Sequence, residues 1–142
     1  MANSWRFKNG ERIVQDSPVP KARSARAITP WTNINGVFYN SIGQAIEGVV
    51  AKGIDVSQWN GDVDWGTVKN TDVDYAIIRC GYGMDQTNQD DPKWKSNADA
   101  CTAYDIPFGV YIYSYADTVE RAVSEAKHVL RLVKGYNLTY PI

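Results

Sequence analysis

After Lys52, short apolar segments alternate with segments of helical periodicity, and this alternation constrains the fold more than any other feature. The apolar segments span residues 53–57, 75–81 and 107–115, and helical patterns cover residues 91–105 and 117–134. Strands that alternate with helices across short loops favour a parallel sheet or a (β/α) barrel. A complete barrel takes about 200–250 residues, whereas about 90 follow Lys52. We therefore expect residues 51–142 to form an α/β region built as an incomplete (β/α) barrel, with its first three to four strands.

Residues 117–134 carry the clearest helical pattern. Their apolar side chains recur at i, i+3 and i+4, which predicts one buried face. Asp117 with Glu120 resembles a capping pair, and Gly135 suits the position where a helix stops. The almost continuous apolar run at residues 75–81 predicts a strand covered on both faces, and Tyr140 should open a fourth strand. The apolar positions of the helix are Val119, Ala122, Val123, Ala126, Val129, Leu130 and Val133.

The first 50 residues have a different pattern. The spacing W-x-x-x-N-G occurs twice, starting at Trp5 and at Trp31. Asn-Gly tolerates positive φ at both positions, as a type I′ hairpin turn requires. Between the two units, residues 16–26 are basic and contain two prolines, which indicates a linker. We expect residues 1–50 to form a small region of aromatic β-hairpins joined by this linker.

Composition excludes several classes of function. Hydrophobic residues make up 44% and charged residues 22%, as in a globular protein. The net charge of −1 offers no general attraction to nucleic acid or to an anionic membrane. No apolar run reaches the ~20 residues that span a bilayer, and the N-terminus does not have the pattern of a signal peptide. Two cysteines and one histidine disfavour a structural zinc site.

Asp55 is the first candidate for chemistry. It lies between Ile54 and Val56 in an apolar strand, and the two-residue period of a strand places Asp55 and Ser57 on one face. In a barrel, polar side chains near the carboxyl ends of the strands face the active site. The alternative is a structural carboxylate that caps a turn or pairs with an arginine.

Arg79 and a row of tyrosines lie on the next two strands. A cation such as Arg79 inside an apolar strand needs a carboxylate partner or a cavity. On the third strand, Tyr111, Tyr113 and Tyr115 occupy alternate positions and share one face. Phenol rings with hydroxyl groups suit carbohydrate, although core packing with satisfied hydroxyls is the alternative. His128 is the only histidine, and we expect it on a solvated flank of its helix with no chemical role.

Several segments, in this order along the chain, resemble glycoside hydrolase family 25. The segment K-G-I-D-V-S-Q-W-N-G at residues 52–61 is similar to the opening strand of that family. The similarity continues at residues 77–83, 90–92 and 106–114 and in the helix at Glu125, and it covers about residues 51–142. The hairpins of residues 1–50 look like the aromatic cell-wall-binding repeats that often accompany such enzymes.

The resemblance implies an N-acetylmuramidase that cleaves the β-1,4 bond between N-acetylmuramic acid and N-acetylglucosamine in peptidoglycan, without a metal or a cofactor. It matches Asp55 to the catalytic-site aspartate of the first strand, and Arg79, Tyr82, Tyr111 and Tyr113 to positions that line the substrate groove. Such an enzyme acts outside the cell or at the cell wall, and its partners are glycan strands rather than nucleic acid or membrane. The alternative is a non-catalytic module that binds cell-wall carbohydrate.

The family carries its proton donor on strand four, as the Glu of a D-x-E pattern. Because the sequence reaches Ile142 where that strand should begin, we expect residues 1–142 to lack the donor and to have little activity alone. General acid catalysis contributes about 10²–10⁴-fold. An unfinished sheet also leaves an edge that can pair with another chain, so self-association is expected.

Two geometric expectations concern neighbouring side chains. Asp55 should enter the same cavity as Arg79 and at least one of Tyr111 or Tyr113. Cys80 follows Arg79 and should face the opposite side of its strand, toward the helix that carries Cys101. A disulfide between the two cysteines and a pair of buried thiols are both compatible with this placement.

Overall fold

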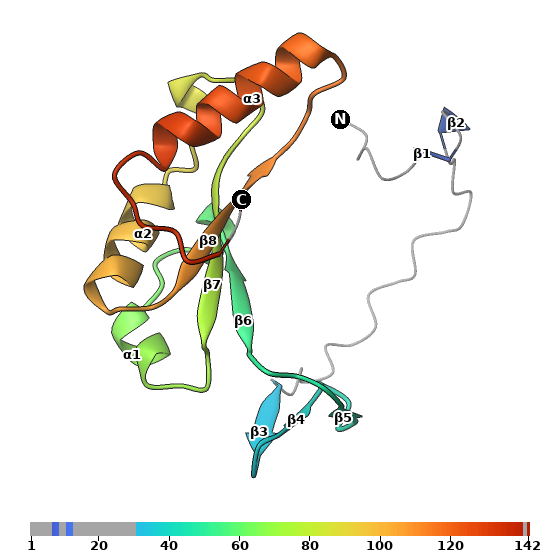
Figure 1. Ribbon diagram of the computed structural model, residues 1–142, viewed down its shortest axis with the longest axis vertical. Coiled ribbons are helices and arrows are strands. Elements are labelled where there is room, and N and C mark those ends of the chain that lie inside the picture. The colour runs from blue at the N-terminus through green and yellow to red at the C-terminus, as the bar shows by residue number, and fades with distance from the viewer. Residues whose placement is uncertain (1–6, 9–10, 13–30, 141) are drawn as a thin grey trace. The chain divides into compact units, whose positions relative to one another are not determined.

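The computed structural model describes residues 7–8, 11–12, 31–140 and 142 (Figure 1). The chain divides into two compact units, Met1–Gly48 and Val49–Ile142, and each is described by itself. The expected linker at residues 16–26 and the first Asn-Gly turn, at residues 9–10, lie outside the described residues.

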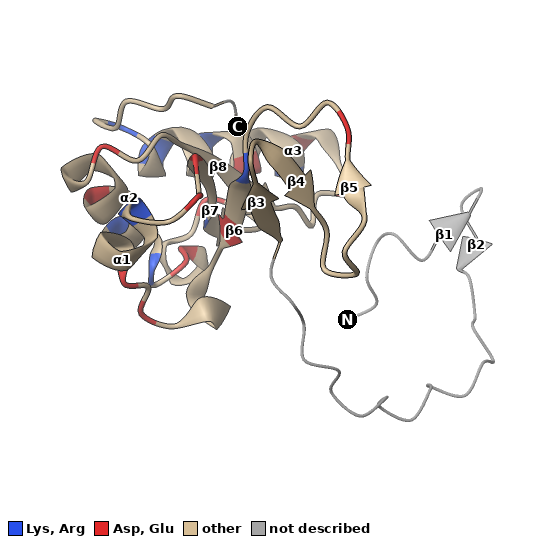
Figure 2. Ribbon diagram, turned by 90° about the horizontal axis from the view of Figure 1, so that it is seen from below, with Lys and Arg blue, Asp and Glu red and all other residues tan. Residues whose placement is uncertain are grey.

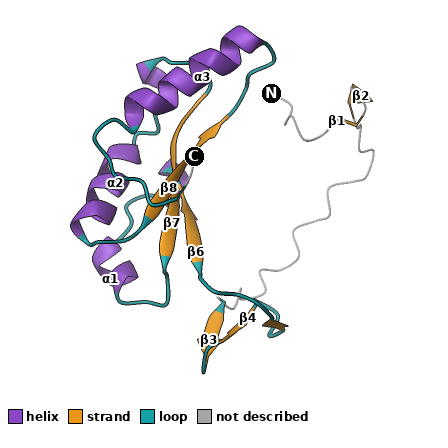
Figure 3. Ribbon diagram, viewed as in Figure 1, coloured by secondary structure: helices purple, strands orange, loops and turns teal. Residues whose placement is uncertain are grey.

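Short antiparallel strands make up the described part of the first unit (Figure 3). The strand β1 (Phe7–Lys8) pairs with β2 (Glu11–Arg12), and a second sheet contains β3 (Thr32–Ile34), β4 (Val37–Tyr39) and β5 (Ala45–Ile46). Asn35 and Gly36 join β3 to β4 with φ angles of 52° and 84°. Gly36 N donates a hydrogen bond to Asn33 Oδ1 at 2.9 Å. The Asn-Gly pair thus supplies the left-handed backbone that a two-residue hairpin turn needs.

A three-stranded parallel sheet forms the centre of the second unit, in the order β6-β7-β8 (Figure 1). Its strands are β6 (Gly53–Val56), β7 (Tyr75–Tyr82) and β8 (Phe108–Tyr113). The helix α1 (Trp65–Lys69) links β6 to β7, α2 (Trp94–Ala103) links β7 to β8, and α3 (Val119–Leu132) follows β8. Two 3-10 helices, η2 (Gln58–Asn60) and η3 (Thr87–Gln89), lie in the loops after β6 and β7. The observed alternation agrees with the α/β fold expected from the sequence.

The three helices cover one face of this sheet (Figure 1). Burial therefore alternates along β7: Ala76, Ile78 and Cys80 are fully buried, whereas Tyr75, Ile77 and Arg79 are half-buried. The strand was expected to be covered on both faces, and within the described residues the second face is only half-buried at positions 75, 77 and 79. This second face carries the candidate site residues. The helix-side core contains Val56, Trp65, Trp94, Ala98, Cys101, Ile106, Phe108, Val110 and Val129.

The buried face of α3 differs from the apolar stripe that the periodicity predicts. Val129 is buried, but Val119, Val123 and Leu130 are 76%, 49% and 64% exposed. The helix instead turns two polar side chains, Glu125 and His128, toward the sheet, and both are buried. The expectation of a solvated His128 is therefore wrong. The polar partners of these two residues lie in the loops that follow β7 and β8. The spacing of apolar residues, from which the buried face was predicted, does not reveal these polar partners.

The ends of the helices also differ in detail from the sequence pattern. The N-cap of α3 is Thr118, whose side chain accepts a hydrogen bond from Arg121 N, while Asp117 forms an ion pair with the Arg121 side chain. The fourth strand expected to begin at Tyr140 is not tested, because residue 141 lies outside the described residues. Thr139 N and Tyr140 N both donate to Phe108 O, at 3.0 and 3.3 Å.

Acidic and basic residues are interspersed along the helices of the second unit (Figure 2). Within the residues that the structure describes, no helix has the length and apolar character needed to cross a membrane. The same residues contain no cluster of three or more His, Cys, Asp or Glu side chains arranged to hold a metal ion.

Candidate active site

A hydrogen bond across the open face of the sheet joins Asp55 to Tyr111. Asp55 lies on the edge strand β6 and Tyr111 on β8, with β7 between them. Tyr111 Oη donates to Asp55 Oδ1 at 3.1 Å, and the Asp55 side chain is exposed to solvent. Burial, together with the negative charge of Asp55, raises the pKa of Tyr111 to about 12. The phenol therefore stays protonated and acts as a fixed donor to the carboxylate.

Arg79 finds its partner in Asp91, which lies in the loop before α2. Arg79 Nε donates to Asp91 Oδ2 at 2.7 Å, and Arg79 Nη2 lies 2.7 Å from the same oxygen. Because both nitrogens meet one oxygen, only Nε makes an aligned hydrogen bond. The side chains of Arg79 and Asp91 are 11% and 0% exposed, so this ion pair is shielded from water.

Asp91 also connects three segments of the chain. Besides Arg79 on β7, it accepts hydrogen bonds from Gln58 N at 3.0 Å and from Lys93 N at 2.8 Å. The first bond holds the start of η2, and the second lies just before α2. One buried carboxylate thus fixes the loop after β6, the guanidinium of β7 and the entrance to α2.

A pocket of about 350 Å³ opens beside Arg79. Tyr113 and Tyr115 form part of its wall with their ring centroids 5.1 Å apart, and the ring of Tyr82 meets that of Tyr115 edge-on at 6.3 Å. Trp59 is 81% exposed and lies at the rim. Such rings stack on the apolar faces of sugars, and the hydroxyl and guanidinium groups donate hydrogen bonds. The described residues that line the pocket are Gln58, Trp59, Arg79, Tyr82, Tyr113 and Tyr115. None of these six side chains is a carboxylate.

The five residues singled out from the sequence fall into two clusters in the second unit. Asp55 and Tyr111 form one, and Arg79, Tyr82 and Tyr113 line the pocket that forms the other. Arg79 pairs in register with Tyr111, so the two clusters meet at the middle of the sheet. The cavity expected to hold Asp55 together with Arg79 and at least one of Tyr111 or Tyr113 is not seen as one pocket: Asp55 contacts Tyr111 but does not line the pocket of Arg79 and Tyr113.

The two cysteines are free thiols, and the disulfide alternative is not formed in the structure. Both are completely buried in the core on the helix side of the sheet. Cys80 Sγ donates to the backbone oxygen of Tyr111 at 3.3 Å instead of bonding to Cys101. Burial raises the pKa of Cys80 to about 11 and that of Cys101 to about 12.

Both thiols are expected to resist modification in the folded chain. Only the thiolate reacts, and burial lowers both its fraction and its accessibility, so a thiol reagent at pH 8 should react about 10²-fold or more slowly than in denaturant. A colorimetric thiol titration measures this. Two thiols should appear in denaturant without a reductant; fewer would indicate a disulfide, and rapid reaction of the native chain would contradict the buried placement.

Three residues that shape this site were not singled out from the sequence: Gln58, Trp59 and Asp91. All three lie in segments that support the family resemblance, so their positions were visible in the sequence. The role of Asp91 was not, because its partner Arg79 lies 12 residues earlier on a buried strand. The sequence did indicate that a buried Arg79 needs a carboxylate partner. It did not indicate which of several aspartates is that partner.

Comparisons with known proteins agree with this geometry. A family model described as glycosyl hydrolases family 25 matches residues 54–140. The modular autolysin LytC from Streptococcus pneumoniae is 34% identical, with a TM-score of 0.67 over 79% of this chain and 27% of that chain. A search of curated proteins gave no match.

Two further solved structures show the fold. A family 25 glycosyl hydrolase from Bacillus anthracis is 22% identical, with a TM-score of 0.59 over 68% of this chain and 42% of that one. The catalytic domain of the endolysin ply40 from bacteriophage P40 of Listeria monocytogenes is 23% identical, with a TM-score of 0.58 over 68% of this chain and 47% of that one. This chain thus spans between about a quarter and half of these relatives. Since the family model covers more than half of the sequence, the chain belongs to family 25 of the glycosyl hydrolases.

Proposed function

We propose that the protein is an N-acetylmuramidase, which cleaves the β-1,4 bond between N-acetylmuramic acid and N-acetylglucosamine in peptidoglycan. The observation that carries the proposal is the Asp55 carboxylate, which Tyr111 holds on the open face of the sheet next to an aromatic pocket. Membership of family 25 supports the reaction class, and the similarity to an autolysin and to an endolysin supports a substrate in the cell wall.

In this proposal Asp55 acts as a carboxylate, not as the proton donor. Glycosidases use one carboxyl group as a general acid and a second group to stabilise the oxocarbenium-like centre or to activate the nucleophile. Asp55 is exposed to solvent and accepts a hydrogen bond from a phenol that stays protonated, which suits the ionised role. We assign no proton donor among the described residues, since the pocket lining there contains no carboxyl group.

The pocket supplies the binding energy for the sugar. Tyr82 and Tyr113 offer ring faces and hydroxyl groups, and Arg79 is held in place by Asp91. Neutralisation of Arg79 by Asp91 fits a substrate whose sugar hydroxyl and acetamido groups are uncharged. The short antiparallel strands of the first unit would add affinity for the wall, as repeats that bind cell-wall carbohydrate do. Action outside the cell or at the wall follows from such a substrate.

A non-catalytic wall-binding module is the second candidate. The absence of a carboxylate from the described pocket lining favours it, because an aromatic pocket with an arginine can bind a glycan without cleaving it. Both candidates predict binding to peptidoglycan, and only the first predicts cleavage.

Replacing Asp55 with asparagine is expected to lower the rate of wall clearing by about 10²–10³-fold, the effect of removing one preorganised electrostatic group from a transition state. Binding to purified peptidoglycan should remain, because the amide oxygen of the new side chain would still accept the Tyr111 hydrogen bond. The assay compares the complete product of the gene with its Asp55→Asn variant, with the exposed Asp117→Asn as the control.

Four outcomes are informative. Clearing that depends on Asp55 supports the muramidase. Binding without clearing, by the gene product and by this chain, identifies the wall-binding module instead. Neither binding nor clearing overturns the peptidoglycan proposal, and an Asp55→Asn variant that clears at the normal rate removes Asp55 from the catalytic residues.

A further inference from the structure

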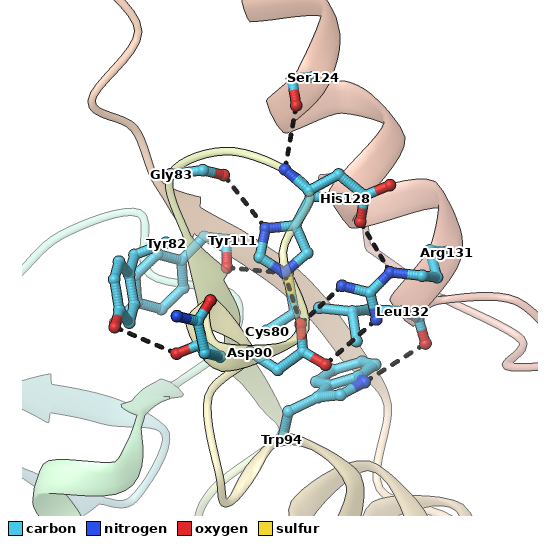
Figure 4. Close-up of polar contacts among 12 residues, drawn as sticks. Cys80, Tyr82, Gly83, Asp90, Trp94, Tyr111, Ser124, His128, Arg131 and Leu132 are labelled. Atoms are coloured by element: carbon cyan, nitrogen blue, oxygen red, sulfur yellow. Dashed lines mark hydrogen bonds and ion pairs between the residues drawn. The ribbon is translucent and has the colours of Figure 1, made fainter. Parts of the chain in front are cut away.

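His128 lies at the centre of a polar network between α3 and the loop of residues 83–90 (Figure 4). Its side chain is completely buried. Nδ1 lies 3.1 Å from the backbone oxygen of Gly83, and Nε2 lies 2.8 Å from Asp90 Oδ1. The two contacts join the beginning and the end of one loop to a single ring on α3.

The chemistry of these two partners fixes the protonation state of the ring. A backbone carbonyl oxygen only accepts, so Nδ1 must carry a proton to bond with Gly83. An ionised carboxylate also only accepts, so Nε2 must carry a proton to bond with Asp90. A neutral imidazole has one N–H and would direct its lone pair at one of these oxygens. Both bonds can therefore exist together only if His128 is an imidazolium.

Asp90 is held in its ionised form. Partial burial works to raise the pKa of Asp90, but hydrogen bonds from Arg131 and His128 outweigh it and hold that pKa below its usual range. Arg131 Nη2 donates to Asp90 Oδ1 at 2.7 Å and Nη1 donates to Oδ2 at 3.1 Å. A protonated Asp90 would lose these charge-assisted bonds, so the proton in this network belongs to the histidine.

The other groups around the ring support a buried cation. Arg131 Nε also donates to Asp85 Oδ1 at 2.7 Å, and Asp85 N donates to Ser124 Oγ at 3.0 Å. The titratable groups that face this network are thus Asp85 and Asp90 from the loop, Arg131 from α3 and the thiol of Cys80 from β7, whose pKa burial raises. Two carboxylates balance the guanidinium and the imidazolium, so the network is neutral as a whole.

The loop that His128 holds is adjacent in sequence to Tyr82, which lines the aromatic pocket. Tyr82 immediately precedes the loop, and its hydroxyl donates to Asn88 O within it at 3.3 Å. Asp91, the partner of Arg79, immediately follows the loop. The ring also leaves no space at Gly81, where an added Cβ would lie 2.8 Å from His128 Cε1. The ring therefore packs directly against the backbone one residue before Tyr82.

We propose that His128 is a positioning residue, present as an imidazolium that clamps the loop of residues 83–90 onto α3 and so fixes the Tyr82 side of the pocket. The effect on ligand binding rests on the proposed function, whereas the protonation state and the clamp do not.

Nitrogen NMR tests the protonation state directly, because His128 is the only histidine in the sequence. With ¹⁵N-labelled histidine in the 142-residue chain, both ring nitrogens should carry protons at pH 7. In an Asp90→Asn variant the second acceptor is no longer a charge, and the ring should shift to the neutral tautomer that keeps its proton on Nδ1. A neutral ring in the unaltered chain would overturn the proposal.

Amide hydrogen exchange tests the clamp. In a His128→Phe variant, exchange in residues 83–90 should accelerate about tenfold or more relative to β6, since two hydrogen bonds are lost there and not in the sheet. Lys127→Ala, at an exposed position on the same helix, is the control. Uniform acceleration over the whole chain, or none, would reduce His128 to ordinary core packing. If His128→Phe does not fold, the Asp90→Asn variant carries the same measurement.

Ligand binding connects the clamp to the pocket. A disaccharide repeat of peptidoglycan should bind about tenfold more weakly to the variant whose loop is released, while Lys127→Ala binds normally. Failure of the unaltered chain to bind the glycan counts against the proposed function and leaves the NMR and exchange results valid. Equal binding by the unaltered chain and the released variant would contradict the link between His128 and Tyr82.

Discussion

Replacing Asp91 with alanine is expected to lower the free energy of unfolding by about 3–5 kcal/mol, the usual effect of removing one partner from a buried ion pair. The Asp91 side chain is fully buried and Arg79 is nearly so, which leaves the guanidinium without a counter-charge in the variant. Two backbone donors, Gln58 N and Lys93 N, lose their acceptor at the same time. Chemical denaturation followed by circular dichroism measures the change.

Asp62→Ala is the matched control for this experiment. Asp62 also forms an ion pair, with Lys93, but its side chain is 90% exposed. Its removal should change the free energy of unfolding by less than about 1 kcal/mol, as is usual for exposed pairs. Equal effects of the two substitutions would show that the Arg79–Asp91 pair is hydrated in solution. An Asp91→Asn variant should fall between them, because it keeps an acceptor and loses the charge.

The parallel strands could be predicted because their signal is local. Each of β6, β7 and β8 contains a short run of apolar residues. The segments of helical periodicity between them indicate helical crossovers, which join parallel strands. Asp55 and Arg79 could be singled out for the same reason, since a charge inside an apolar strand is conspicuous. The face that these residues share follows from the two-residue period and the parallel register.

The buried face of α3 could not be predicted, because burial there depends on partners rather than on hydropathy. Glu125 and His128 interrupt the apolar stripe in the sequence, yet both are buried, while Val119 and Leu130 are exposed. Their partners are a backbone nitrogen, a hydroxyl, a carbonyl oxygen and a carboxylate in two distant loops. Any one of these groups is available at many positions of a chain, so the sequence alone does not identify the match.

Replacing Glu125 with alanine is expected to lower the free energy of unfolding by about 3 kcal/mol, since hydrogen bonds to a buried charged group contribute about 1.5–3 kcal/mol each. Glu125 Oε1 accepts from Tyr115 N at 2.7 Å, and Oε2 accepts from Ser114 Oγ at 2.6 Å. Both donors lie in the loop directly after β8. Tyr113 at the end of β8 and Tyr115 in this loop form the tyrosine wall of the pocket. Release of the two donors should loosen the contact between Tyr113 and Tyr115 as well. Denaturation curves and the affinity for a peptidoglycan disaccharide measure the two effects.

Glu125→Gln separates the hydrogen bonds from the charge. The amide oxygen can accept from Tyr115 N while the amide nitrogen donates to Ser114 Oγ, because a hydroxyl can reverse its role. We therefore expect the Glu125→Gln variant to retain more than half of the stability that the Glu125→Ala variant loses, and Lys127→Ala, at an exposed position on α3, to change little. If Gln is as destabilising as Ala, the negative charge and not the pair of hydrogen bonds holds the loop. If Ala is tolerated, the tyrosine wall is fixed by ring packing alone, and Glu125 has no part in shaping the pocket.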